Sequence, residues 1–278
     1  ADQFRADESI EEARAEYAKT LAIEDISPDQ KAEVHTWIAG TYSGEERAEA
    51  RAELAKALEI EDVSAHRKVQ IIRSIADQFR ADESIEEARA EYAKTLAIED
   101  ISPDQKAEVH TWIAGTYSDD EPEARWEEQS KALAVEGISG NKKVQLLRTM
   151  ASFHRQADDI ESARAEYAKV LTVEGLSPDQ KSEAHIWISD TYSGEERAEA
   201  RAELEKALAI EGVSGHRKAD LMLRMVGHYQ ADGMTDEARA ELGRLLDMED
   251  APDHTKKRAE QILNDMRARV EQVPDEGA

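Results

Sequence analysis

The chain has 278 residues, with 36 Lys and Arg against 62 Asp and Glu, so its formal net charge is −26. A surface this acidic repels nucleic acid and anionic membranes, and the absence of cysteine excludes disulfides, cysteine-bound zinc and thiol nucleophiles. No apolar run approaches the roughly 18 residues that a membrane span needs. No signal peptide is visible, and the start at Ala1 rather than Met indicates a processed or truncated N-terminus, so the compartment stays unassigned.

An internal repeat of 75 residues organises the whole chain. Residues 1–43 recur unchanged as residues 76–118, and two drifted copies begin at Ala151 and Val226. Each copy contains two similar halves, as residues 49–62 and 87–100 illustrate. The structural unit is therefore about 37 or 38 residues long, which is typical of a helical hairpin in a solenoid.

In chain order, the repeat predicts half a hairpin, six full hairpins and a final helix. Residues 1–7 match only the end of a hairpin's first helix. The full hairpins are expected at 28–61, 65–99, 103–136, 140–174, 178–211 and 215–248. A capping helix from Pro252 to about Val270 and a frayed tail follow. We therefore expect a solenoid over residues 1–251 and a C-terminal cap with its tail over residues 252–278.

Helix caps and apolar periodicity support this division. SPDQK occurs at Ser27, Ser102 and Ser177, where Ser caps the helix, Pro takes the first position and Gln completes a capping box. Apolar residues recur at helical spacing between the caps, for example at positions 34, 37, 38, 41 and 42. One hairpin cannot bury such a stripe alone, so neighbouring hairpins must stack. With no strand signal, the fold class is an all-α solenoid.

The hairpins resemble the tetratricopeptide repeat (TPR). In the second helix, Ala88, Tyr92 and Leu96 match the family's run of small residue, aromatic residue and leucine; first-helix residues 72, 75, 76 and 79 match its large, large, small and aromatic positions. The resemblance covers nearly the whole chain, although Asp62 and Asp100 replace the usual closing proline. It implies a right-handed superhelix of antiparallel hairpins, whose concave face, lined by first helices, binds an extended peptide or a partner helix.

The same resemblance places a row of arginines on the concave face. They are Arg5, Arg73, Arg80, Arg148 and Arg155. Arginine binds carboxylates bidentately, which favours an acidic peptide or a C-terminal carboxylate as partner. The alternative is ordinary surface pairing with nearby glutamates. The last copy departs from the row, because Leu223 and Gln230 replace its arginines.

Histidines and aromatic residues form further ladders at the repeat spacing. His35, His110 and His185 each lie two residues before a Trp and indicate either simple structural repetition or a pH-sensitive groove. One metal ion cannot bridge them, because a zinc site needs three or four converging ligands. The Trp and Tyr ladders are interpreted as hairpin core or as an exposed aromatic surface. Trp126 has no counterpart in the other copies and is interpreted as a surface anchor or as a core residue. The ladder residues are Trp37, Trp112, Trp187, Tyr42, Tyr117 and Tyr192.

No phosphate loop, GxSxG or HExxH motif is present, so we predict no enzyme activity, no cofactor and no metal site. The preferred hypothesis is a protein-interaction scaffold that binds a protein or peptide in its groove. One alternative is a structural protein that assembles end to end, because near-identical repeats have nearly interchangeable ends. Another is an engineered or fragmentary array, which the exact 43-residue duplication favours. The partner and the oligomeric state are not predicted.

Overall fold

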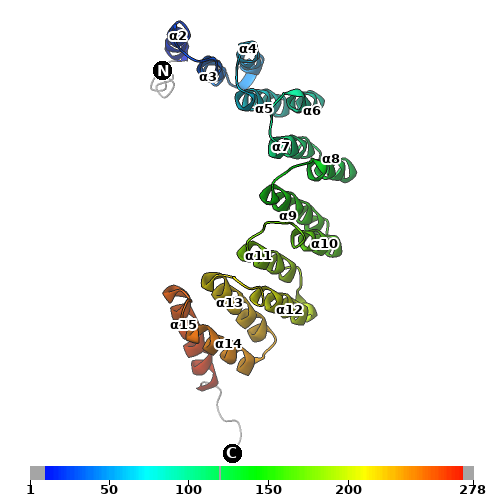
Figure 1. Cartoon of the computed structure of the whole chain (residues 1–278), viewed down its shortest axis with the longest axis vertical. Coiled ribbons are helices and arrows are strands. Elements are labelled where there is room, and N and C mark those ends of the chain that lie inside the picture. The colour runs from blue at the N-terminus through cyan, green and yellow to red at the C-terminus, as the bar shows by residue number, and fades with distance from the viewer. Residues whose placement is uncertain (1–9, 119, 272–278) are drawn as a thin grey trace, which may run out of the picture. The chain divides into compact units, whose positions relative to one another are not determined.

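The computed structural model describes residues 10–118 and 120–271, and all regular secondary structure in these ranges is helical. The chain divides into two compact units, Ala1–Ser139 and Gly140–Ala278. In both units, helices that follow each other in the chain pack as antiparallel pairs (Figure 1). The predicted all-α architecture of tandem helical hairpins is confirmed.

The first unit contains three full hairpins after the single helix α2 (Ile10–Leu21). They are α3 (Pro28–Ala39) with α4 (Arg47–Leu58), α5 (Ala65–Ala81) with α6 (Ile85–Lys94), and α7 (Pro103–Ala114) with α8 (Pro122–Ala134). The short 3₁₀ helices η1 (Gly44–Glu46) and η2 (Thr95–Ala97) adjoin α4 and α6. The expected helix end at residues 1–7 lies outside the described residues.

The second unit contains three more hairpins and a last helix. They are α9 (Gly140–Gln156) with α10 (Ile160–Val170), α11 (Pro178–Ser189) with α12 (Arg197–Leu208), and α13 (Gly215–Ala231) with α14 (Thr235–Asp247). The 3₁₀ helix η3 (Gly194–Glu196) leads into α12, and α15 (Asp253–Glu271) packs against α14 and α13. Along unit 2 in Figure 1, the pairs follow one another in chain order from green to red.

The predicted capping boxes begin α3, α7 and α11. In each, the Ser side chain accepts a hydrogen bond from the Gln backbone N–H, and the Gln side chain accepts one from the Ser backbone N–H. The pairs are Ser27–Gln30, Ser102–Gln105 and Ser177–Gln180. These local bonds satisfy amides that the first helical turn leaves free, so each helix starts at a fixed residue.

The turns after α4, α6, α8, α10 and α12 each contain a residue with left-handed backbone. Gly137, Gly175 and Gly212 have φ values of 81°, 76° and 85° there. Asp62 and Asp100, which replace the proline of the TPR pattern, have φ values of 60° and 63°. Because proline is restricted to a φ near −65°, it does not fit this turn, whereas Gly and Asp do.

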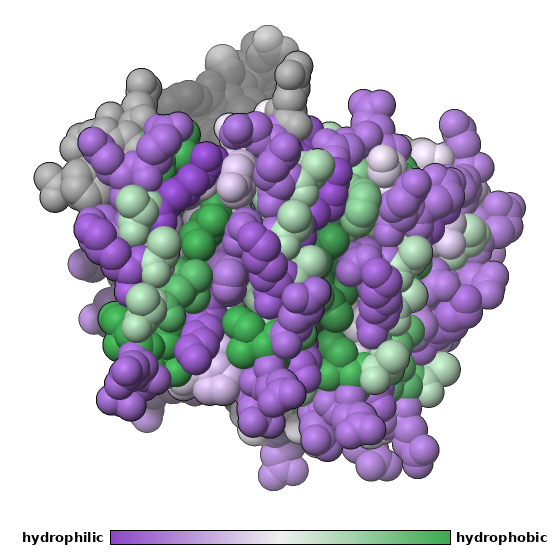
Figure 2. Space-filling view, turned by 90° about the horizontal axis from the view of Figure 1, so that it is seen from above, coloured by the Kyte–Doolittle hydropathy of each residue, from purple (hydrophilic) through white to green (hydrophobic). Residues whose placement is uncertain are grey.

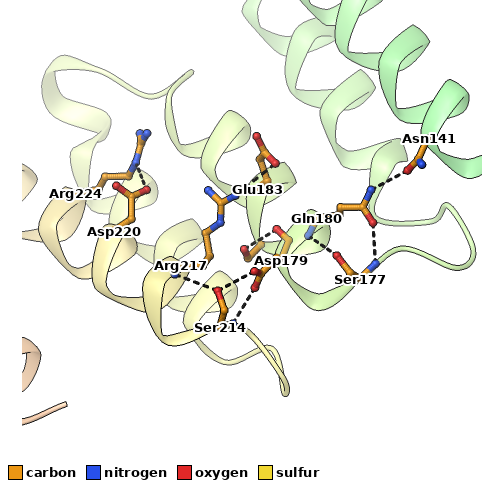
Figure 3. A network of polar contacts seen from close by, with 10 residues as sticks. Asn141, Ser177, Asp179, Gln180, Glu183, Ser214, Arg217, Asp220 and Arg224 are labelled. Atoms are coloured by element: carbon orange, nitrogen blue, oxygen red, sulfur yellow. Dashed lines mark hydrogen bonds and ion pairs between the residues drawn. The ribbon is translucent and has the colours of Figure 1, made fainter. Parts of the chain in front are cut away.

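Two kinds of polar link recur between neighbouring elements within the units. Asp179, in the first turn of α11, accepts hydrogen bonds from the backbone N–H and hydroxyl of Ser214, both at 2.8 Å (Figure 3). Arg164 of α10 donates to the Thr191 hydroxyl at 2.8 Å and lies 3.7 Å from the centroid of the Tyr192 ring. The first link recurs at Asp29–Ser64 and Asp104–Ser139, and the second at Arg14–Thr41 and Arg89–Thr116.

Apolar residues fill the space inside and between hairpins. Leu54 and Leu204 are buried, and each packs against the first helix of its own hairpin and that of the next. On the face that Figure 2 presents, hydrophilic residues cover most of the surface and hydrophobic residues emerge in narrow bands between them.

Candidate partner-binding surface

The first helices α9 and α11 of unit 2 form a shallow depression of about 240 Å³. Its polar rim includes Asn141 and Gln180, whose side chains are joined by a hydrogen bond of 2.9 Å (Figure 3). Its lining residues are Asn141, Val144, Gln145 and Arg148 of α9 with Gln180, Glu183 and Trp187 of α11. Small-molecule pockets usually measure about 300–1,000 Å³, so this depression suits a single side chain better than a cofactor.

An arginine covers a half-buried tryptophan at this surface. The guanidinium carbon of Arg148 lies 5.2 Å from the Trp187 ring centroid, and Tyr167 packs against the same indole with ring centroids 5.7 Å apart. Unit 1 repeats the arrangement with Arg73 at 4.9 Å from Trp112. The tryptophans are therefore neither fully buried core nor a free aromatic ladder, because packing and cation–π contacts hold them between neighbouring helices.

Trp37 differs from its two counterparts in exposure. Its side chain packs on Tyr17, with ring centroids 5.7 Å apart, as the other tryptophans pack on their tyrosines. It is nevertheless 41% exposed, whereas Trp112 and Trp187 are half-buried. Trp126 of α8 is also half-buried, and Tyr42, Tyr117 and Tyr192 each lie under an arginine.

The predicted arginines fall into two groups. On α5, Arg73 and Arg80 lie 3.8 Å and 3.9 Å from the two carboxylate oxygens of Asp77. Asp77 also accepts a hydrogen bond from the Tyr92 hydroxyl. The burial of Tyr92 and, to a smaller extent, this hydrogen bond raise the pKa of Tyr92 to about 12. On α9, Arg148 and Arg155 are exposed and Ser152 stands in the place of Asp77. Arg5 lies outside the described residues.

Two carboxylates, one in α11 and one at its C-cap, are paired with arginines on α13. Glu183 lies 3.6 Å from Arg217, and Asp190 lies 3.1 Å from Arg224. Arg224 also contacts Asp220 at 3.3 Å within its own helix (Figure 3). The neighbouring first helices α11 and α13 are thus joined by ion pairs.

The predicted histidines lie inside the hairpins rather than free on the surface. His35, His110 and His185 are 13–17% exposed, and each Nδ1 lies within 2.8–3.0 Å of a glutamate on the second helix. The partners are Glu53, Glu128 and Glu203, each of which also accepts a hydrogen bond from a lysine three residues later. Sequence reasoning missed these partners, although the constant 18-residue spacing from His to Glu was a visible signal.

These glutamates, of which Glu128 is buried and the other two are half-buried, have a lowered pKa and stay ionised. Burial alone would raise the pKa of Glu203, but hydrogen bonds from Lys206 and His185 outweigh it and lower that pKa below its ordinary value of 4.5. The same balance holds for Glu53 and Glu128. Each histidine therefore links the first helix of its hairpin to an ionised glutamate on the second helix.

Over the described ranges, no three His, Asp or Glu side chains gather into a group that could hold a metal ion. Within the same ranges, no helix is long and apolar enough to span a bilayer.

No protein-family model matches the chain. No curated protein sequence matches it either. Several solved structures do match the chain. The chain is similar to BtubC of P. vanneervenii at 17% identity and a TM-score of 0.48, over 86% of this chain and 93% of that chain. It is similar to the C-terminal part of a TPR repeat-containing protein from Cytophaga hutchinsonii at 14% identity and a TM-score of 0.48, over 94% and 96%.

A chain in the structure of Naa15/Naa10 bound to HypK-THB is similar at 12% identity and a TM-score of 0.50. The match covers 96% of this chain and 45% of that chain. The protein has a TPR-like fold. At such low identity the likeness shows the fold alone, and this TPR-like fold is a scaffold of helical repeats.

Proposed function

We propose that this TPR-like protein is an interaction scaffold that binds an extended segment of a partner protein along its first helices. The observation that carries the proposal is the depression between α9 and α11, with amide side chains beside a half-buried indole. Asn141, Gln145 and Gln180 already make hydrogen bonds through their amide oxygens, but each keeps N–H donors and a second oxygen lone pair that a peptide backbone can use. Val144 and Trp187 supply the apolar contact for one partner side chain.

The comparisons support a protein as the partner. One of the similar solved structures, Naa15/Naa10 bound to HypK-THB, is a complex of proteins. The charge of −26 argues against nucleic acid, because phosphate backbones repel acidic surfaces. A groove built from first helices would bind its ligand through several weak contacts spread over neighbouring hairpins.

A test needs binders and a variant that blocks the groove. Peptides are selected from a random 12-residue library on the immobilised full chain, and their affinities are measured in solution by fluorescence anisotropy. Gln145→Trp places a bulky side chain in the depression and is expected to weaken binding at least tenfold. Ala168→Trp, at an exposed position of the second helix α10, is the matched control and should bind as the wild type does.

Two results would count against the proposal. Equal binding by both tryptophan variants would remove the groove as the site. Growth of the protein into larger species with concentration in sedimentation velocity, without any peptide sensitive to Gln145→Trp, would favour the end-to-end assembly considered from the sequence.

A further inference from the structure

Helices α5 and α9 are repeat counterparts that differ in one charge. In α5, Asp77 lies between Arg73 and Arg80 and within 3.9 Å of both guanidiniums. The equivalent position in α9, 75 residues later, is Ser152. The hydroxyl cannot neutralise a guanidinium, so the substitution removes the shared counter-charge.

Both α9 arginines consequently lack a carboxylate. Arg148 contacts the Trp187 ring, and Arg155 is exposed; over residues 10–118 and 120–271 neither has an ion-pair partner. Two carboxylates of the neighbouring first helix and its C-cap are already engaged, Glu183 by Arg217 and Asp190 by Arg224. Two uncompensated guanidiniums on an otherwise strongly acidic chain are a local site for anions.

We propose that the α9 surface of unit 2 selects acidic segments of the partner, and that its counterpart in unit 1 does not. This inference rests on the proposed function, since Arg148 lines the depression described above and the acidic segment would be the partner segment bound there. The ligand groups are two carboxylates, one on each of Arg148 and Arg155. The arginine that stacks on Trp187 keeps its guanidinium edge available, because a cation–π contact uses only the flat face.

The spacing of the arginines defines the spacing of the carboxylates. Arg148 and Arg155 are seven positions apart in the helix, which corresponds to roughly 10.5 Å along its axis. A polyproline II segment rises about 9.3 Å over three residues and returns its side chains to the same side. Acidic residues three positions apart in such a segment would therefore reach both guanidiniums at once.

The probe is a fluorescein-labelled (Glu-Pro-Pro)₄ peptide, with (Gln-Pro-Pro)₄ as the uncharged control. Binding to the full chain is measured by anisotropy at roughly 0.1 M salt, where the screening length of about 10 Å damps repulsion from distant acidic residues. We expect the glutamate peptide to bind at least tenfold more tightly than the glutamine peptide. Equal affinity for the two peptides would overturn the proposal.

The chain provides its own matched variants. Ser152→Asp copies the α5 arrangement into α9 and is expected to reduce binding of the glutamate peptide to the level of the glutamine peptide. Asp77→Ser makes the reverse change in α5 and should raise the number of binding sites per chain from one to two. Arg155→Gln, at an exposed position, should independently weaken binding of the glutamate peptide. Circular dichroism checks that each variant is folded.

The outcomes separate this inference from the proposed function. If library-selected peptides are blocked by Gln145→Trp but are insensitive to Ser152→Asp, the groove stands and the acidic selectivity is wrong. If the glutamate peptide is sensitive to Ser152→Asp, the selectivity is supported.

Discussion

At the scale of single residues, the repeat lets equivalent positions be compared within one molecule. Gln129 of α8 stands where Leu54 and Leu204 stand in α4 and α12, 75 residues away on either side. It is 1% exposed, and its Oε1 has no hydrogen-bond partner among the described residues. A buried amide oxygen without a partner opposes folding, whereas leucine at this position fills the core.

We therefore expect Gln129→Leu to stabilise the protein by about 1–3 kcal/mol. Urea unfolding followed by circular dichroism measures the shift of the midpoint. The reciprocal change Leu204→Gln should lower the midpoint by a comparable amount. A midpoint that stays the same or falls in Gln129→Leu would mean that the amide is satisfied in solution.

A second comparison concerns the turns between the two helices of three hairpins, α5–α6, α9–α10 and α13–α14. Glu83 and Asp158 have a φ of 59°, and the equivalent Gly233 has a φ of 71°. Left-handed backbone costs a residue with a side chain about 1–2 kcal/mol, part of which the greater freedom of glycine in the unfolded chain offsets. Glu83→Gly should therefore raise the unfolding free energy by about 0.5–1 kcal/mol, and Gly233→Ala should lower it. Calorimetry measures both free energies of unfolding; a less stable Glu83→Gly or a more stable Gly233→Ala would contradict this expectation.

At the scale of helical elements, a glutamate with little solvent exposure recurs on the second helices in two settings. Glu203 is paired with His185 and Lys206, and its pKa is lowered. Glu241 has no such histidine, its Oε1 is unpartnered among the described residues, and burial raises its pKa although Arg244 acts in the opposite direction. The two settings give opposite linkage between protonation and folding.

A carboxyl whose pKa is lowered by folding stabilises the protein above its ordinary value of 4.5, and this stability is lost as the pH falls below that value. Glu203→Gln should therefore reduce stability at pH 7 and flatten its decline between pH 5 and pH 3, measured by urea unfolding at each pH. Glu241→Gln should cost less at pH 7, because it removes a poorly compensated buried charge. An unchanged pH profile in Glu203→Gln would show that the triad contributes nothing.

The hairpins could be predicted from the sequence because their signals are local. The capping boxes at Ser27, Ser102 and Ser177 and the helical apolar spacing act within single helices. The glutamate partners of the histidines were not predicted, since they depend on how two helices pack. The Asp77 to Ser152 difference was visible in the sequence, but its effect on Arg148 became clear only from distances in α5.

At the scale of the whole molecule, the division into two units predicts that each folds by itself, because a helical hairpin contacts only its neighbours. A fragment comprising residues 140–278 should show the same helicity per residue as the full chain by circular dichroism. A control fragment of residues 157–278 lacks α9 and should lose part of the remaining helicity, since α10 then exposes its apolar face. An unfolded 140–278 fragment would show that the units depend on each other.

If the partner lies on the first helices, it should protect their amides. Hydrogen–deuterium exchange of the full chain is measured with and without a library-selected peptide at saturation. We expect slower exchange in α9 and α11, with α10 and α12 little changed. Protection confined to α10 and α12 would contradict it.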